Sequence, residues 1–197
     1  MRLSRRHILL ATAALPLLAA APSFASGGGA DDYVHELGTK VLKLTAGGHR
    51  GDKALQQRFG NLLNQYVNLP QLASFALGTN RASMPAGDKG MFNGLLSNYA
   101  AALFVWYVAD FQGSELKITN VSKQGAFTTV DSSIVGSNEP LRWRLSGNTG
   151  SWRVSDVNVK GVWLSIAMKK MFDDTLRESH GDFKPLYAKL READTWN

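Results

Sequence analysis

The sequence predicts an α+β fold in which helices precede and follow an antiparallel sheet. Apolar residues in the first half of the chain recur every three or four positions, the period of an amphipathic helix. From residue 116 onward they alternate with polar residues, as in half-buried strands. Helical spacing then returns. The short turns between the strands favour a meander over the long crossovers of a parallel sheet.

Four helices are expected before the sheet. The first carries apolar residues over positions 34–44. The second follows Asp52, which can cap it, and the short third helix closes at Gly78. Residues 79–87 are expected to form a loop, and the fourth helix is expected over about 88–111.

The second half of the fourth helix has no polar face. Residues 101–109 are all apolar, and nine residues are too few to cross a bilayer, which takes about 20. A helix that is apolar all round is buried on all sides. It is therefore either a central core helix or a helix with one face on the sheet and another lining an internal cavity.

Four strands are expected, over about 116–121, 127–135, 141–145 and 152–159. The alternation in the last strand slips at Asp156, so either a bulge re-aims the strand or both of its faces are covered. Two helices follow. The first is expected to begin at Val162 and to run to about Ser179. The last is expected to use Asp182 as its cap and to bury Phe183, Leu186, Tyr187 and Leu190.

The N-terminus has the pattern of an export signal. A charged start with Arg5 and Arg6 precedes an apolar run, and small residues allow cleavage after Ala25. The arginine pair also matches a twin-arginine signal, and no cysteine follows for lipid attachment. We expect residues 1–25 to be removed and residues 26–197 to form one exported domain.

The composition excludes several classes of protein. Removal of residues 1–25 takes away three arginines and no acid, which lowers the formal charge from +6 to +3. No dense basic stripe marks a nucleic-acid interface. The chain has no cysteine, so its stability must come from core packing rather than from disulfides.

We find no catalytic pattern, and we expect neither an enzyme nor a cofactor or metal. His35, His49 and His180 lack partners at ligand spacing. No phosphate loop, dinucleotide fingerprint or nucleophile elbow occurs. Asp156 is the carboxylate of most interest. It either accepts backbone N–H groups at the bulge or pairs with an arginine, or it serves as a general acid, which would need a second titratable group.

An excess of large apolar side chains is the feature of the sequence that points to a function. Large apolar side chains crowd both the helices and the sheet, and they suit either a simple core or a cavity for an acyl chain. Basic residues flank the strands, and they face either an anionic head group, a partner protein or merely solvent; these are Arg142, Arg144, Arg153 and Lys160.

These residues resemble a known family. The block 152–164, followed by a helix through Phe172, looks like the MlaC family of periplasmic phospholipid-binding proteins. The helix that ends in Leu77-Gly78, the long helix with Tyr99 and the strand 140–145 also fit it. The resemblance implies helices on a curved antiparallel sheet that enclose an apolar lipid pocket.

The resemblance also implies a function. Members of the family are soluble carriers that shuttle phospholipid between an outer-membrane lipoprotein complex and an inner-membrane ABC transporter complex, without catalysis. Two departures leave the lipid open. The loop 79–85 lacks the tryptophan common in the family, and Trp106-Tyr107 is additional. A hopanoid or another polycyclic isoprenoid lipid is therefore the alternative ligand, as in the hopanoid-associated HpnM branch of the family.

We expect the lipid pocket to be lined from the helices, from the inner face of the sheet and from the start of the following helix. The expected lipid-binding residues are Phe59, Leu62, Tyr66, Phe75, Leu96, Tyr99, Leu103, Tyr107, Val130, Trp143, Val157, Val162, Trp163, Leu164 and Met168. Two other classes remain open. A non-lipid adaptor that docks on a membrane complex would have a solid core, and an enzyme would bring two titratable side chains into one cleft.

Overall fold

The chain folds into the α+β arrangement that the sequence predicts. The computed structural model describes residues 28–106, 113–136 and 140–195, so the expected export signal lies outside the described residues. The main elements are α1 (Ala30–Thr45), α2 (Lys53–Tyr66), α3 (Leu69–Leu77), α4 (Lys89–Trp106), β1 (Leu116–Gln124), β2 (Phe127–Ile134), β3 (Pro140–Ser146), β4 (Arg153–Val159), β5 (Val162–Trp163), α5 (Leu164–Glu178) and α6 (Lys184–Arg191).

The strands form one antiparallel meander in the order β1-β2-β3-β4-β5. The sequence predicted a helix from Val162, and this prediction was wrong by two residues. Lys160 and Gly161 have φ values of 52° and 86°, the left-handed pair that a tight two-residue hairpin needs. The chain therefore turns back along β4 as the short strand β5, and α5 begins at Leu164.

The change of phase in β4 is a β-bulge. Arg144 pairs with Asp156, whereas the next residue of β3, Leu145, pairs with Val154. Ser155 is therefore the additional residue, and Val154, Ser155 and Asp156 are buried in succession. The bulge turns the Asp156 side chain toward the start of α5, where it serves the site described below.

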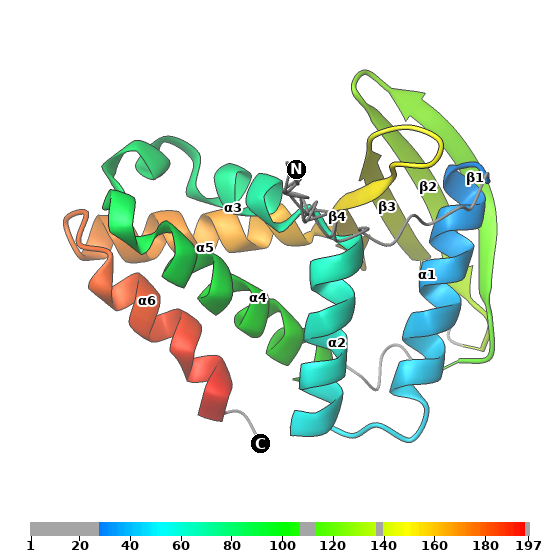
Figure 1. Cartoon of the computed structure of the whole chain (residues 1–197), viewed down its shortest axis with the longest axis horizontal. Coiled ribbons are helices and arrows are strands. Elements are labelled where there is room, and N and C mark those ends of the chain that lie inside the picture. Colours follow the sequence, from blue (N-terminus) through cyan, green and yellow to red (C-terminus); the bar gives the residue numbers. More distant parts are fainter. Residues whose placement is uncertain (1–27, 107–112, 137–139, 196–197) are drawn as a thin grey trace, which may run out of the picture.

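The helices divide into two groups around α2 (Figure 1). α1 lies across one face of the sheet, and α3, α4, α5 and α6 form a helical group on the far side of α2. Each group has its own apolar core. The described part of α4 packs mainly on α2, on α6 and on the 3₁₀ turn Glu192–Thr195, so the expectation that one of its faces lies on the sheet is not met for these residues. The last part of the expected helix, 107–111, lies outside the described residues.

Local sequence signals account for most helix ends. The Asp52 side chain accepts a hydrogen bond of 2.9 Å from the Leu55 amide, which is the expected N-cap of α2. Gly78 ends α3 with a φ of 52°. The segment 79–87 was expected to be a loop, but two 3₁₀ helices, Gly78–Ser83 and Ala86–Asp88, occupy most of it.

One glycine sets how closely α1 approaches the sheet. A Cβ atom at Gly38 would lie 2.3 Å from Cδ2 of Leu116, the first residue of β1. A larger residue at this position would have to displace the leucine side chain. Gly38 therefore lets α1 close over the sheet edge, and the two residues face the cavity described next.

Candidate functional site

A largely apolar cavity of about 470 Å³ lies where α1, α2 and α4 face the sheet and the start of α5. Its volume falls within the range of about 300–1,000 Å³ that small-molecule sites occupy. The charged residues among its lining are Asp156, in the middle of β4, and Lys160, in the turn after it. The rest of the wall is almost entirely hydrocarbon and aromatic.

The helices reach the cavity through one stripe of side chains each. α2 contributes Phe59, Leu62, Leu63 and Tyr66, which lie at three- and four-residue intervals and therefore on one side of the helix. α4 contributes Ala100, Leu103 and Phe104, all toward its C-terminal end. The apolar end of α4 is thus partly explained by the cavity, as the second of the two sequence interpretations supposed.

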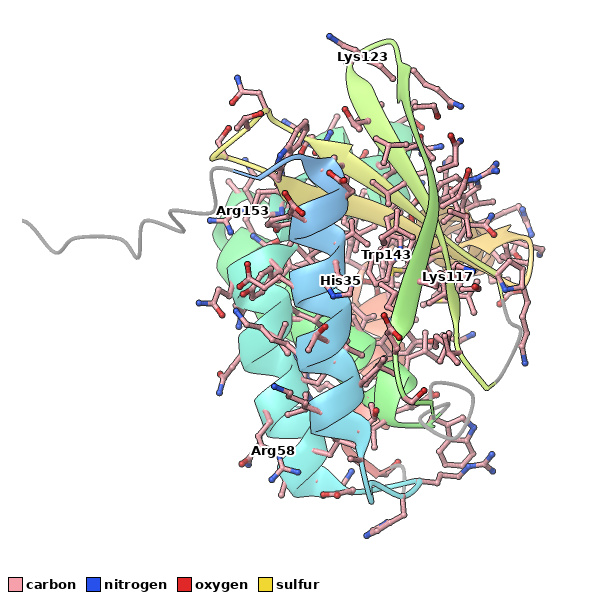
Figure 2. The ribbon with its side chains drawn as sticks, turned by 90° about the vertical axis from the view of Figure 1, so that its right-hand side faces the viewer. His35, Arg58, Lys117, Lys123, Trp143 and Arg153 are labelled. Atoms are coloured by element: carbon pink, nitrogen blue, oxygen red, sulfur yellow. The ribbon has the colours of Figure 1, made fainter. Side chains whose placement is uncertain are left out.

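Trp143 forms part of the sheet wall. Its indole Nε1 donates a hydrogen bond of 2.9 Å to Oγ of Ser132 on β2, which satisfies the polar atom of this buried ring. Figure 2 shows Trp143 in the interior, whereas Lys123 stands at the tip of the β1–β2 hairpin. Trp143 pairs across the sheet with Val157, which also lines the cavity.

The structure brings nine of the sequence-predicted pocket residues together around this cavity. They come from α2, α4, β3, β4, β5 and the beginning of α5. These residues are Phe59, Leu62, Tyr66, Leu103, Trp143, Val157, Val162, Leu164 and Met168.

The other predicted residues lie elsewhere in the structure, except Tyr107, which is outside the described residues. Leu96 and Tyr99 belong to the helical core, because that part of α4 faces α3, α5 and α6 rather than the cavity. Val130 is fully buried in the core between α1 and the sheet. Phe75 is 44% exposed on α3.

Trp163 was expected to line the lipid pocket, but it is not among the residues that line the cavity. The Arg144 guanidinium lies 4.1 Å from the centre of its indole ring, a cation–π contact. β5 therefore presents Val162 to the cavity, whereas Trp163 is used to hold an arginine.

Sequence reasoning missed the contribution of α1. Leu37, Gly38, Val41 and Leu42 all line the cavity, together with residues at the sheet edge such as Leu116. The three- and four-residue spacing in α1 was visible in the sequence. It identified a buried face, but it gave no sign that this face meets an empty space rather than a packed core.

A cluster of polar groups between α1 and the end of α2 fixes Tyr66 in the wall. Its backbone carbonyl accepts a hydrogen bond of 3.0 Å from the Tyr33 hydroxyl, and burial raises the pKa of Tyr33 to about 12. The Tyr66 hydroxyl accepts a hydrogen bond from Lys40, which also pairs with Glu36. The hydrogen bond from Lys40 lowers the pKa of Glu36. These contacts tie α1 to the end of α2.

Asp156 has a structural role at one end of the cavity. One carboxylate oxygen accepts hydrogen bonds from the backbone amides of Val157 (2.9 Å) and Ser165 (3.0 Å), and the other accepts one from the Ser165 hydroxyl. Nη1 of Arg144 lies 3.6 Å from Oδ2 of Asp156, so Arg144 is the counter-ion of this carboxylate. Asp156 thus both accepts backbone N–H groups and pairs with an arginine, and it caps α5 from a neighbouring strand.

The described residues hold no cluster of three histidine, cysteine, aspartate or glutamate side chains that could bind a metal ion. The groups around Asp156 are donors and a cation. No second acid or base is among the partners of Asp156 given above.

The lining of the cavity reaches solvent at the β4–β5 turn, here called the mouth. Val162 lines the cavity and is 53% exposed, so this residue touches both the interior and the solvent. Lys160, two residues earlier in the turn, is the cation of the lining. The cavity thus has a charged mouth and an apolar interior, which is the polarity of an amphiphile held tail first.

Comparisons with known proteins agree with this arrangement. The model of the MlaC family, described as "MlaC protein", matches residues 37–192. The structure of a phospholipid-binding protein from Ralstonia solanacearum, solved in complex with a phospholipid, is similar to this chain. The TM-score is 0.66 at 16% sequence identity, over 84% of this chain and 94% of that one. No curated protein sequence matches the chain. None of the described helices combines the length and the hydropathy of a membrane span.

Proposed function

The chain belongs to the MlaC family, and from this premise we propose that it is a carrier that binds phospholipid by its acyl tails. The family is non-enzymatic, in agreement with the expectation that the chain is not an enzyme. The resemblance stated from the sequence is confirmed over most of the chain.

The cavity is the observation that carries the proposal. Each methylene group that leaves water for an apolar site contributes about 0.8 kcal/mol, so a tail gains affinity along its length without any specific polar contact. A solid core, which a non-lipid adaptor would have, does not agree with a space of about 470 Å³ between α1, α2, α4 and the sheet.

The polarity of the cavity indicates how the lipid is held. The tails lie among the apolar residues of α1, α2 and the sheet, and the phosphate stays at the mouth near Lys160. Two arginines of the sheet, Arg142 and Arg153, have their own partners. Arg142 pairs with Asp131, and Arg153 donates a hydrogen bond to the Gln65 carbonyl.

In the cell, we propose that the chain acts in the periplasm after removal of residues 1–25. Its partners there would be an outer-membrane lipoprotein complex and an inner-membrane ABC transporter complex, between which it carries phospholipid. The family membership and the cavity support this proposal.

Transfer between membranes tests the proposed function. Donor vesicles of labelled phosphatidylglycerol and phosphatidylethanolamine are mixed with unlabelled acceptor vesicles, and residues 26–197 are added at increasing concentration. We expect the label to move to the acceptors in proportion to the protein. A parallel set of donors carries a labelled hopanoid. Transfer of the hopanoid alone would show that the ligand is a hopanoid and not a phospholipid. Transfer of neither lipid would contradict the carrier function.

A further inference from the structure

Two phenylalanine rings close the cavity between α2 and α4. The rings of Phe59 and Phe104 are stacked, with centroids 3.6 Å apart and planes 7° from parallel. Both rings line the cavity. Rings at this separation are in van der Waals contact, so a hydrocarbon chain cannot pass between them.

Phe59 is the first residue of α2 that lines the cavity, and Phe104 is the last described residue of α4 that does so. One turn before Phe59, Leu55 is fully buried in a separate small cluster with Val105, and Phe104 packs against that cluster from the cavity side. Neither Leu55 nor Val105 faces the cavity. Among the described residues, the Phe104 ring is therefore backed by the apolar side chains of Leu55 and Val105.

The pair also lies far from the mouth. The end of α2 is fixed to β4 by a bridge between Val67 and Val154. Phe59 is eight residues earlier in the chain, about 12 Å along the helix axis. Val154 lies at the start of β4, whereas the β4–β5 turn follows the end of this strand, so a tail that enters at the turn passes along β4 before it reaches α2 and the two rings.

We propose that the Phe59–Phe104 stack is the floor of the acyl site and sets the longest tail that the protein accepts. This inference rests on the proposed function, and it names the two residues that determine specificity for tail length. A methylene beyond the floor has to stay in water, which disfavours binding about fourfold for each such group.

Selective extraction from mixed vesicles tests the inference. The vesicles hold equal amounts of phosphatidylglycerols whose saturated tails lengthen by two methylenes at a time, and the protein-bound fraction is analysed by mass spectrometry. The wild-type protein should take tails equally up to a limit and then discriminate steeply against longer ones. Phe59→Ala should move this limit to longer tails by at least one step, and Phe59→Trp should move it to shorter ones.

Phe92→Ala is the matched control, because it also removes a phenylalanine ring, but from the helical core. Phe92 is fully buried and packs edge-on against Phe172, at a centroid distance of 5.8 Å, away from the cavity. The control should keep the wild-type limit. The same limit in all variants, or a shift in Phe92→Ala equal to that in Phe59→Ala, would overturn the inference while leaving lipid binding intact. A wild-type protein that extracts no lipid would instead overturn the proposed function.

Discussion

Replacement of Asp156 by alanine is expected to lower the free energy of unfolding by about 3 kcal/mol. The carboxylate is buried, accepts two backbone amides and the Ser165 hydroxyl, and has Arg144 as its counter-ion. Without it, the Ser165 amide in the first turn of α5 loses its cap, and the guanidinium loses its charge partner. Chemical denaturation followed by tryptophan fluorescence measures the change.

Asp131→Ala is the control for this prediction. Asp131 also pairs with an arginine on the neighbouring strand, but the side chains of Asp131 and Arg142 are 23% and 53% exposed. Water screens such a pair, and its loss should cost less than about 1 kcal/mol. Equal losses for Asp156→Ala and Asp131→Ala would show that Asp156 does not hold β4 and α5 together.

The second large effect is expected for Leu103→Asp, which should weaken lipid retention by more than about tenfold. Leu103 faces the cavity from the end of α4 and is only partly buried, so in the empty protein the new carboxylate can be hydrated. A bound tail would have to remove that water, and desolvation of a charge costs several kcal/mol, whereas tenfold corresponds to about 1.4 kcal/mol. The measurement is lipid bound per protein after gel filtration.

Met91→Asp provides the comparison on the same helix. Met91 is 39% exposed, and it does not line the cavity. This variant should keep both its folding yield and its lipid. If Leu103→Asp lost stability and lipid to the same extent, Leu103 would be a core residue rather than part of a binding surface.

Periodicity in the sequence predicted the elements and their order, because it records which faces are buried. The stripe of α2 and the alternation of β3 led directly to Phe59, Tyr66 and Trp143. The bulge at Ser155 was also visible, as a change of phase next to Asp156.

Periodicity cannot tell a buried side chain that packs from one that faces a void. Leu96 and Leu103 are seven residues apart and lie on similar sides of α4, yet Leu96 enters the helical core and Leu103 enters the cavity. The difference arises because Leu96 lies in the part of α4 that packs in the helical core, whereas the C-terminal end of α4, with Leu103, borders the cavity. The turn at Lys160–Gly161 was missed for another reason: an apolar Val162 suits a strand as well as a helix, and only pairing with β4 decides between them.

The most direct test is to extract purified residues 26–197 with organic solvent and to identify and quantify the lipids in the extract by mass spectrometry. The proposed function predicts about one phospholipid for each protein molecule, or uptake of one when phosphatidylglycerol vesicles are offered to protein that was first stripped. A protein that comes out empty, and that stays empty after the stripped form is offered lipid, would contradict a cavity built to carry acyl tails.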